Sequence, residues 1–155
     1  MKRRLMLALL LGPVLAGCAS VPVPPAIQDT EIINAPFDKV WSAIVGTLAE
    51  QSLPIQSIDK ASGLVTTQFV VFANGILAQR AIDKVAVKPS SLLYTWSGGR
   101  YMLSIFVTKS GENQTRVKIT THIEAFENNV TYSWMICYSN GTIENQLFNA
   151  IKAKI

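Results

Sequence analysis

The sequence predicts an α+β fold in which an antiparallel curved sheet packs against a long N-terminal helix and a C-terminal helix. Residues 37–48 carry apolar side chains at helical spacing, and residues 140–155 show a second, similar pattern. Residues 100–109 and 115–126 alternate apolar with polar side chains, as half-buried strands do. The apolar face of such a sheet must be covered, and we expect the two helices to cover it.

The N-terminus has the features of an export signal. Lys2, Arg3 and Arg4 give it a basic start, and residues 5–15 form an apolar run. This run is too short to cross a bilayer, which needs roughly 20 apolar residues. We therefore expect the segment to be cleaved from the mature chain.

The residues that follow this run predict how the chain is anchored. Leu15-Ala16-Gly17-Cys18 resembles the lipobox of bacterial lipoproteins, in which the signal is cut before the cysteine and a diacylglycerol is attached to its thiol. The resemblance implies a lipoprotein signal peptide at residues 1–17 and lipidation of Cys18. Two or more acyl chains give stable membrane anchoring. By resemblance to Gram-negative sorting, Ala19 implies the outer membrane. We expect the domain at the periplasmic face, with exposure at the cell surface as the alternative.

Residues 18–29 are expected to be a tether and residues 30–155 a single α+β domain. Three prolines within residues 19–27 favour an extended, semi-rigid spacer. Within the domain we expect a short strand at residues 30–34, followed by the first helix. This helix should end before Pro54, which disfavours a helical residue in front of it.

The middle of the domain is less clearly patterned. Residues 53–59 and 64–72 predict a hairpin. Residues 74–85 fit either a weak helix or a strand with a long loop. Residues 88–99 are rich in serine, glycine and proline and are predicted to be a loop.

The two clearest strands, residues 100–109 and 115–126, predict a sheet with one buried and one solvated face. Their apolar side chains share one face, while His122 and Glu124 point to the other. The last helix is expected to begin near Asn140.

Several short segments resemble the helix-grip domains of BamC, a lipoprotein of the outer-membrane β-barrel assembly machinery. They are residues 35–41 (Ala-Pro-Phe-Asp-Lys-Val-Trp), 53–55 (Leu-Pro-Ile) and 62–66 (Ser-Gly-Leu-Val-Thr). Residues 137–144 resemble the opening of the last helix of these domains. The resemblance implies a helix-grip, BamC-like fold. BamC has two such domains and a long N-terminal segment, so the contacts of that segment do not carry over.

Composition argues against nucleic-acid binding and against enzyme chemistry. Lys and Arg number 14 against 10 Asp and Glu, and removal of the signal leaves 11 against 10, with no basic patch. The one histidine, His122, is expected on a solvated strand face, and the acids are too scattered for a metal site. We therefore predict no enzyme activity, no cofactor and no metal.

Cysteine and aromatic residues supply the remaining candidates. With Cys18 lipidated, Cys137 has no disulfide partner, and its apolar neighbours favour a buried, inert thiol. Aromatic residues with polar tips are favoured at interfaces. The candidates for a partner surface are Tyr94, Trp96, Tyr101, Tyr132 and Trp134, with completion of the core as the alternative role.

The sequence thus predicts a non-enzymatic, membrane-anchored envelope lipoprotein that binds protein partners, in outer-membrane assembly or maintenance. The alternative is a module that binds a lipid or a small apolar ligand in the cavity between sheet and helix.

Overall fold

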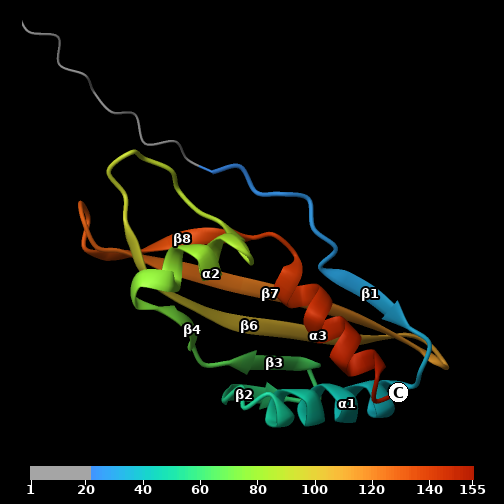
Figure 1. Cartoon of the computed structure of the whole chain (residues 1–155). Coiled ribbons are helices and arrows are strands. Elements are labelled where there is room, and N and C mark those ends of the chain that lie inside the picture. Colours follow the sequence, from blue (N-terminus) through green and yellow to red (C-terminus); the bar gives the residue numbers. More distant parts are fainter. Residues whose placement is uncertain (1–21) are drawn as a thin grey trace, which may run out of the picture.

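The computed structural model describes residues 22–155, which form an α+β fold with an open antiparallel sheet of eight strands and three α-helices (Figure 1). The strands are β1 (Thr30–Ile33), β2 (Ile55–Asp59), β3 (Leu64–Thr67), β4 (Val70–Asn74), β5 (Ala86–Val87), β6 (Trp96–Gly111), β7 (Gln114–Glu127) and β8 (Ser133–Ser139). The helices are α1 (Phe37–Glu50), α2 (Ala78–Asp83) and α3 (Thr142–Lys152), and a short 3-10 turn, η1 (Gly75–Leu77), precedes α2.

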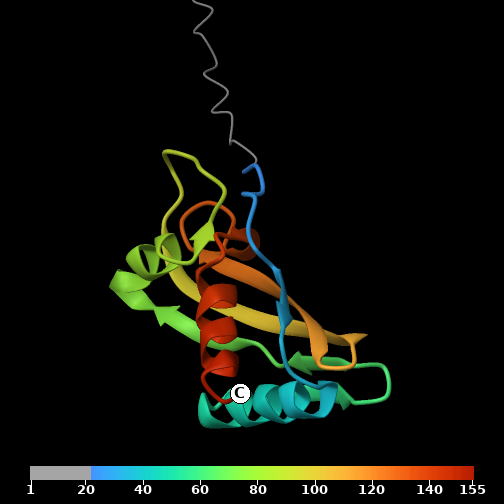
Figure 2. The same cartoon turned by 90° about the vertical axis from the view of Figure 1, so that its right-hand side faces the viewer.

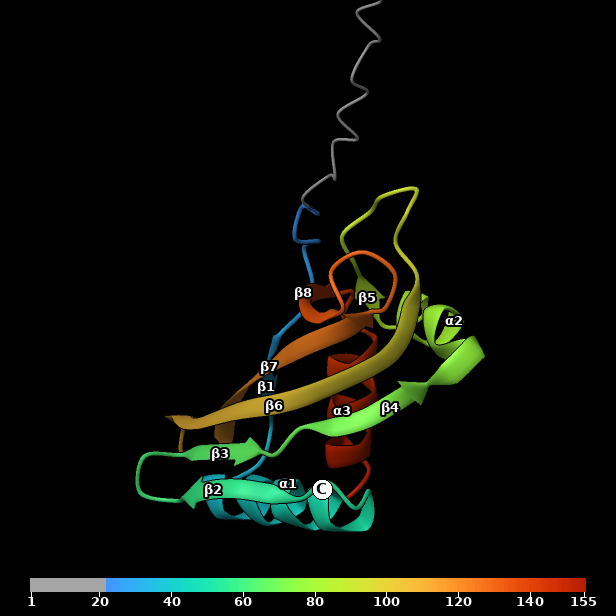
Figure 3. The same cartoon turned by 90° about the vertical axis from the view of Figure 1, so that its left-hand side faces the viewer.

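The long strands β6 and β7 form the centre of the sheet. Their antiparallel pairing runs from Trp96 opposite Glu127 to Gly111 opposite Gln114. Strands β3 and β4 lie one after the other along the second edge of β6, as Figure 3 shows, and β1 and β8 do the same along β7. Strand β2 extends the sheet beyond β3, and β5 extends it beyond β8.

The three helices contact the same face of this sheet, where one hydrophobic core forms. Helices α1 and α3 also pack against each other (Figure 2). The α1 side chains Ile44 and Leu48 are fully buried, as are Phe148 and Ile151 of α3. Trp41 is 6% exposed, so it belongs to the core, as its place in the apolar stripe predicts.

The structure confirms the predicted fold class only in part. The α+β class and the antiparallel sheet are confirmed, but a long N-terminal helix is not borne out. The described chain begins with an extended segment and β1, and α1 has 14 residues. After α1, Ser52 adopts a positive φ of 55°, a conformation that a helix cannot continue.

The segment that fitted either a helix or a strand with a long loop divides between several elements. It contains the end of β4, then η1 and α2, so the domain has a third helix that the predicted architecture lacked. Helix α2 packs on β6, where Gly99 leaves room for Ile82: a β-carbon on Gly99 would lie 3.0 Å from the Ile82 side chain.

The predicted loop at residues 88–99 is wrong at its C-terminal end. Strand β6 begins at Trp96 and includes Gly98 and Gly99, which the sequence placed in the loop. Glycine has a low strand propensity, but here the missing side chains make room for neighbours on both faces of the sheet.

Candidate functional site

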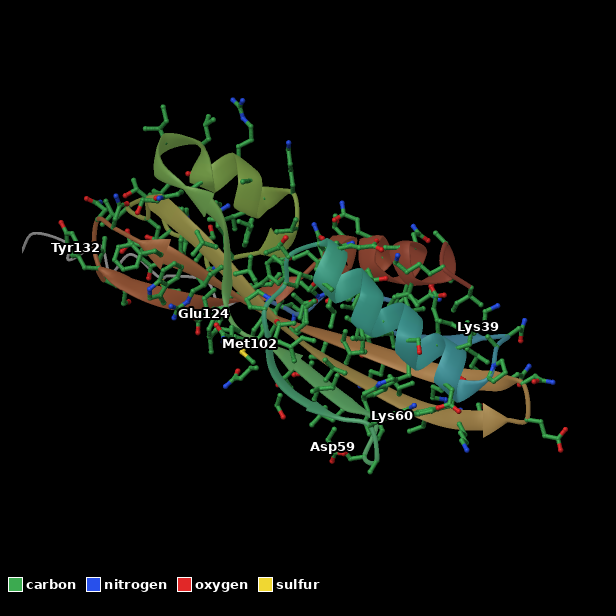
Figure 4. All side chains as sticks on the ribbon, turned by 90° about the horizontal axis from the view of Figure 1, so that it is seen from below. Lys39, Asp59, Lys60, Met102, Glu124 and Tyr132 are labelled. Atoms are coloured by element: carbon green, nitrogen blue, oxygen red, sulfur yellow. The ribbon has the colours of Figure 1, made fainter. Side chains whose placement is uncertain are left out.

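The face of the sheet opposite the helices is not covered by any element of the described chain, and it carries more apolar surface than the strand pattern predicts. Figure 4 shows Met102 and Glu124 side by side on this outer face, away from α1. Even-numbered residues point outward between residues 98 and 108 of β6 and between residues 116 and 126 of β7, and most of their odd-numbered neighbours belong to the core. Val71 of β4 and Ile136 of β8 flank them, and each is more than half exposed.

Register places the outward residues of four strands next to one another. Arg100 pairs with Glu124 across β6 and β7, Val71 lies opposite Arg100, and Ile136 lies opposite Glu124. Together they form a row across β4, β6, β7 and β8. Side chains directly opposite in antiparallel strands lie close enough to interact.

At the centre of this row Arg100 is held between two aromatic rings. Its guanidinium carbon lies 4.3 Å from the centre of the Phe69 ring and 4.1 Å from that of Trp134. A guanidinium within about 6 Å of an aromatic ring is attracted by the negative face of the ring. Phe69 also contacts His122 edge-on, with ring centres 5.8 Å apart. We call Phe69, Arg100, His122, Glu124 and Trp134 the outer-face cluster.

Glu124 joins the two basic side chains of the cluster. Its Oε2 accepts from Nε of Arg100 at 2.7 Å and lies 2.6 Å from Nη2, while its Oε1 lies 3.0 Å from Nε2 of His122. Burial of the carboxylate opposes ionisation, but these contacts outweigh it and lower the pKa of Glu124. The Arg100 charge is therefore balanced within the cluster, and the exposed surface around it is apolar and aromatic.

The missing side chain of Gly98 leaves space for the Trp134 ring, which contacts Arg100. A β-carbon on Gly98 would lie 3.3 Å from the Trp134 ring. Phe126, opposite both residues in register, packs edge-on against the tryptophan at 5.4 Å between ring centres. Gly98, which the sequence placed in a loop, thus helps to shape this cluster.

A second organised feature is the carboxylate of Glu127 at the end of β7, which is fully buried. Its oxygens accept hydrogen bonds from the backbone N–H groups of Thr95 (3.2 Å), Asn129 (2.7 Å), Val130 (2.9 Å) and Thr131 (2.6 Å). Burial alone would raise the pKa of Glu127, but the four donors outweigh it and lower the pKa to about 2. This ionised side chain joins the β5–β6 loop to the β7–β8 loop.

A cavity of about 450 Å³ lies between the sheet and α3. Apolar and aromatic side chains make most of its lining, with two glutamines among them. The lining residues are Gln51, Leu53, Phe72, Val85, Tyr101, Leu103, Ile143, Gln146 and Leu147. Its volume falls in the range of small-molecule sites, about 300–1,000 Å³.

The structure does not bring the five predicted aromatic residues into one surface. Trp96 is buried and contacts Tyr94 edge-on, and Tyr101 lines the cavity on the helix-covered face. Tyr132 is exposed in the β7–β8 loop, and Trp134 lies in the outer-face cluster. Their role in partner binding stays a prediction, and only Trp134 belongs to the cluster.

Of the two cysteines, only Cys137 lies within the residues that the structure describes. Cys18 and the signal sequence lie outside the described residues. Cys137 is buried and free, as predicted, and burial raises the pKa of its thiol to about 11.

Sequence reasoning missed Phe69 and Arg100 as members of a site. The only local signal was the pair His122 and Glu124, two residues apart on one strand and therefore on one face.

Residues 22–155 contain no group of three or more His, Cys, Asp or Glu side chains placed to hold a metal ion. In the same residues no helix has the length and apolar character needed to span a membrane.

No known protein family matches this chain, and no curated protein matches its sequence.

Proposed function

We propose that this chain is a non-enzymatic lipoprotein of the bacterial envelope, held on the outer membrane by lipid on Cys18, that binds a protein partner through the outer-face cluster. The lipobox-like residues 15–18 and the basic and apolar run before them support the anchor. The resemblance to BamC supports a helix-grip domain and a role in outer-membrane assembly or maintenance.

The observation that carries the partner-binding proposal is the position of Arg100 between Phe69 and Trp134 on an uncovered sheet face. Tryptophan and arginine are enriched among the residues that contribute most to protein–protein binding energy. The exposed Val71 and Ile136 extend this centre into an apolar surface. Because Glu124 balances the Arg100 charge, we expect the partner to present an apolar patch with hydrogen-bonding groups at its rim.

The test is crosslinking of the tagged, lipidated protein in native membranes, followed by identification of the recovered partners. Ile136→Glu places a charge beside the cluster at a position that is 61% exposed, so the core is untouched. Ile76→Glu is the matched control, because Ile76 is fully exposed on η1. We expect Ile136→Glu to lose the partners that the parent and Ile76→Glu recover. Equal recovery by both variants, or no specific partner at all, would refute the proposal.

The cavity between the sheet and α3 favours a second candidate function, the binding of a lipid or a small apolar ligand. Native mass spectrometry of the protein purified without detergent tests it. Gln146 lies exposed on the cavity lining, so Gln146→Trp should obstruct the cavity, whereas Asn149→Trp, on the same helix outside the lining, should not. A ligand lost only from Gln146→Trp supports this function, and its retention in both variants opposes it.

A further inference from the structure

Two loops at one end of the domain expose apolar side chains to solvent. Leu92 is fully exposed and Leu93 is 64% exposed in the loop between β5 and β6. Val130 and Tyr132 are also exposed, in the loop between β7 and β8. We call residues 89–95 and 128–132 the loop tip.

The loop tip is free of charged side chains. Residues 89–95 are Pro-Ser-Ser-Leu-Leu-Tyr-Thr and residues 128–132 are Asn-Asn-Val-Thr-Tyr. Burial of such a surface in a less polar phase therefore carries no cost of removing a charge from water. Leucine with flanking tyrosine is also the composition favoured where a protein meets the lipid–water interface.

Direct hydrogen bonds hold the two loops together as one unit. The side-chain amide of Asn129 donates to the Leu93 carbonyl at 2.6 Å, and the backbone N–H of Asn128 donates to the Thr95 carbonyl at 3.0 Å. The buried carboxylate of Glu127 accepts from the backbone of both loops. The apolar side chains are therefore presented by an ordered platform.

The loop tip lies at the end of the domain where the described chain begins. In Figures 1, 2 and 3 the loop at residues 89–95 and the start of the described chain, which begins at residue 22, lie at the same end of the molecule, opposite α1. Three residues separate Pro22 from Cys18. A fully extended chain advances at most about 3.6 Å per residue, so Cys18 lies within roughly 14 Å of Pro22.

We propose that the loop tip inserts Leu92 and Leu93 into the lipid–water interface of the membrane that holds the anchor. This rests on the proposed lipidation of Cys18, because the short connection keeps this end of the domain beside the lipid headgroups. The partner of this surface is thus a phospholipid bilayer, and the domain has a fixed orientation on it.

The experiment places one fluorescent label on the lipidated full-length protein in vesicles of phosphatidylethanolamine and phosphatidylglycerol. Leu92→Cys labels the loop tip, and Ser110→Cys labels the exposed end of β6 at the opposite end of the sheet. Cys137 stays unlabelled, because it is buried and its pKa is raised to about 11. We expect an environment-sensitive label at residue 92 to shift its emission to the blue and to be quenched by spin-labelled lipid. At residue 110 it should do neither.

A second variant separates insertion from mere proximity. With the label moved to Tyr132→Cys, replacement of both Leu92 and Leu93 by serine should reduce the quenching by lipid. Unchanged quenching would show that the leucines do not hold the tip in the membrane and would overturn the inference. A label at residue 92 that is shielded without vesicles would also overturn it, because a protein surface would then cover the tip.

Mass spectrometry of the N-terminal peptide distinguishes failure of the membrane insertion from failure of the lipid anchor. Lipid on Cys18 together with a water-exposed label at residue 92 overturns the inference and leaves the proposed anchor intact. Absence of lipid on Cys18 overturns the anchor, and the inference with it.

Discussion

Alanine at Gly63 should destabilise the domain far more than alanine at another glycine with the same backbone angle. Gly63 lies in the turn between β2 and β3 with a φ of 73°, and its carbonyl accepts from the backbone N–H of Val107 at 2.8 Å. A β-carbon on Gly63 would lie 2.0 Å from the Val107 carbonyl oxygen, where real contacts stay above 3.0 Å. The turn must therefore move away from β6.

The loss of folding stability in Gly63→Ala has three contributions. A non-glycine residue in the left-handed region costs about 1–2 kcal/mol, loss of the hydrogen bond to Val107 about 1 kcal/mol, and crowding about 1–3 kcal/mol. We expect the free energy of unfolding to fall by about 3–6 kcal/mol. At roughly 3 °C per kcal/mol for a domain of this size, the Tm should fall by about 9–18 °C.

Gly75 is the matched control. It has the same φ of 73°, but nothing lies within 4 Å of the β-carbon that alanine would add. Gly75→Ala should therefore cost only about 1–2 kcal/mol. Urea and thermal unfolding followed by circular dichroism measure both variants. If Gly63→Ala were no less stable than Gly75→Ala, the docking of the β2–β3 turn on β6 would be wrong.

Three further substitutions test the core, the cluster and the loops. Trp41→Ala removes a side chain that is 6% exposed, and the free energy of unfolding in urea should fall by about 3–5 kcal/mol. A fall of less than about 1 kcal/mol would contradict the place of Trp41 in the core. Arg100→Gln leaves the carboxylate of Glu124, whose side chain is 16% exposed, without its main charged partner. The free energy of unfolding should therefore fall by about 1–3 kcal/mol. An unchanged urea midpoint would contradict the ion pair. Glu127 has a folded pKa of about 2 against an ordinary 4.5, so its contribution to stability is full above pH 4.5 and is lost as the pH falls toward 2. Glu127→Gln should therefore be less stable at neutral pH and should lose less stability on acidification than the parent; parallel pH profiles would contradict this assignment.

The parts of the fold that local patterns determine were predictable. Alternation in β6 and β7 gave the correct face for His122 and Glu124, because side chains two residues apart on a strand share a face. The burial of Trp41 followed from helical spacing in the same way. Each of these results depends on neighbours only a few residues away in the chain.

The outer-face cluster was not predictable, because its members come from segments far apart in the sequence. Arg100 follows two glycines that favour a turn, and only packing against Ile82 and Trp134 explains why they lie in a strand. A register shift between Trp96 and Gly98 changes which face each residue occupies, so Trp96 enters the core although it is even-numbered. A bulge of this kind depends on the partner strand, which local sequence does not reveal.

The same short stretch of β7 and β8 serves both the outer-face cluster and the loop tip. On β7, Glu124 belongs to the cluster, and Glu127, three residues later, orders the loops. Beyond β7, Tyr132 lies in the loop tip, and Trp134, two residues later on β8, contacts Arg100. If the tip rests on the membrane, the outer-face cluster stands beside the lipid surface and faces sideways along it. A partner held in the same membrane then meets the cluster without a long tether on either protein. Because Glu127 orders the loop that leads into Trp134, its loss should weaken both membrane contact and partner binding, whereas Ile136→Glu should weaken partner binding alone.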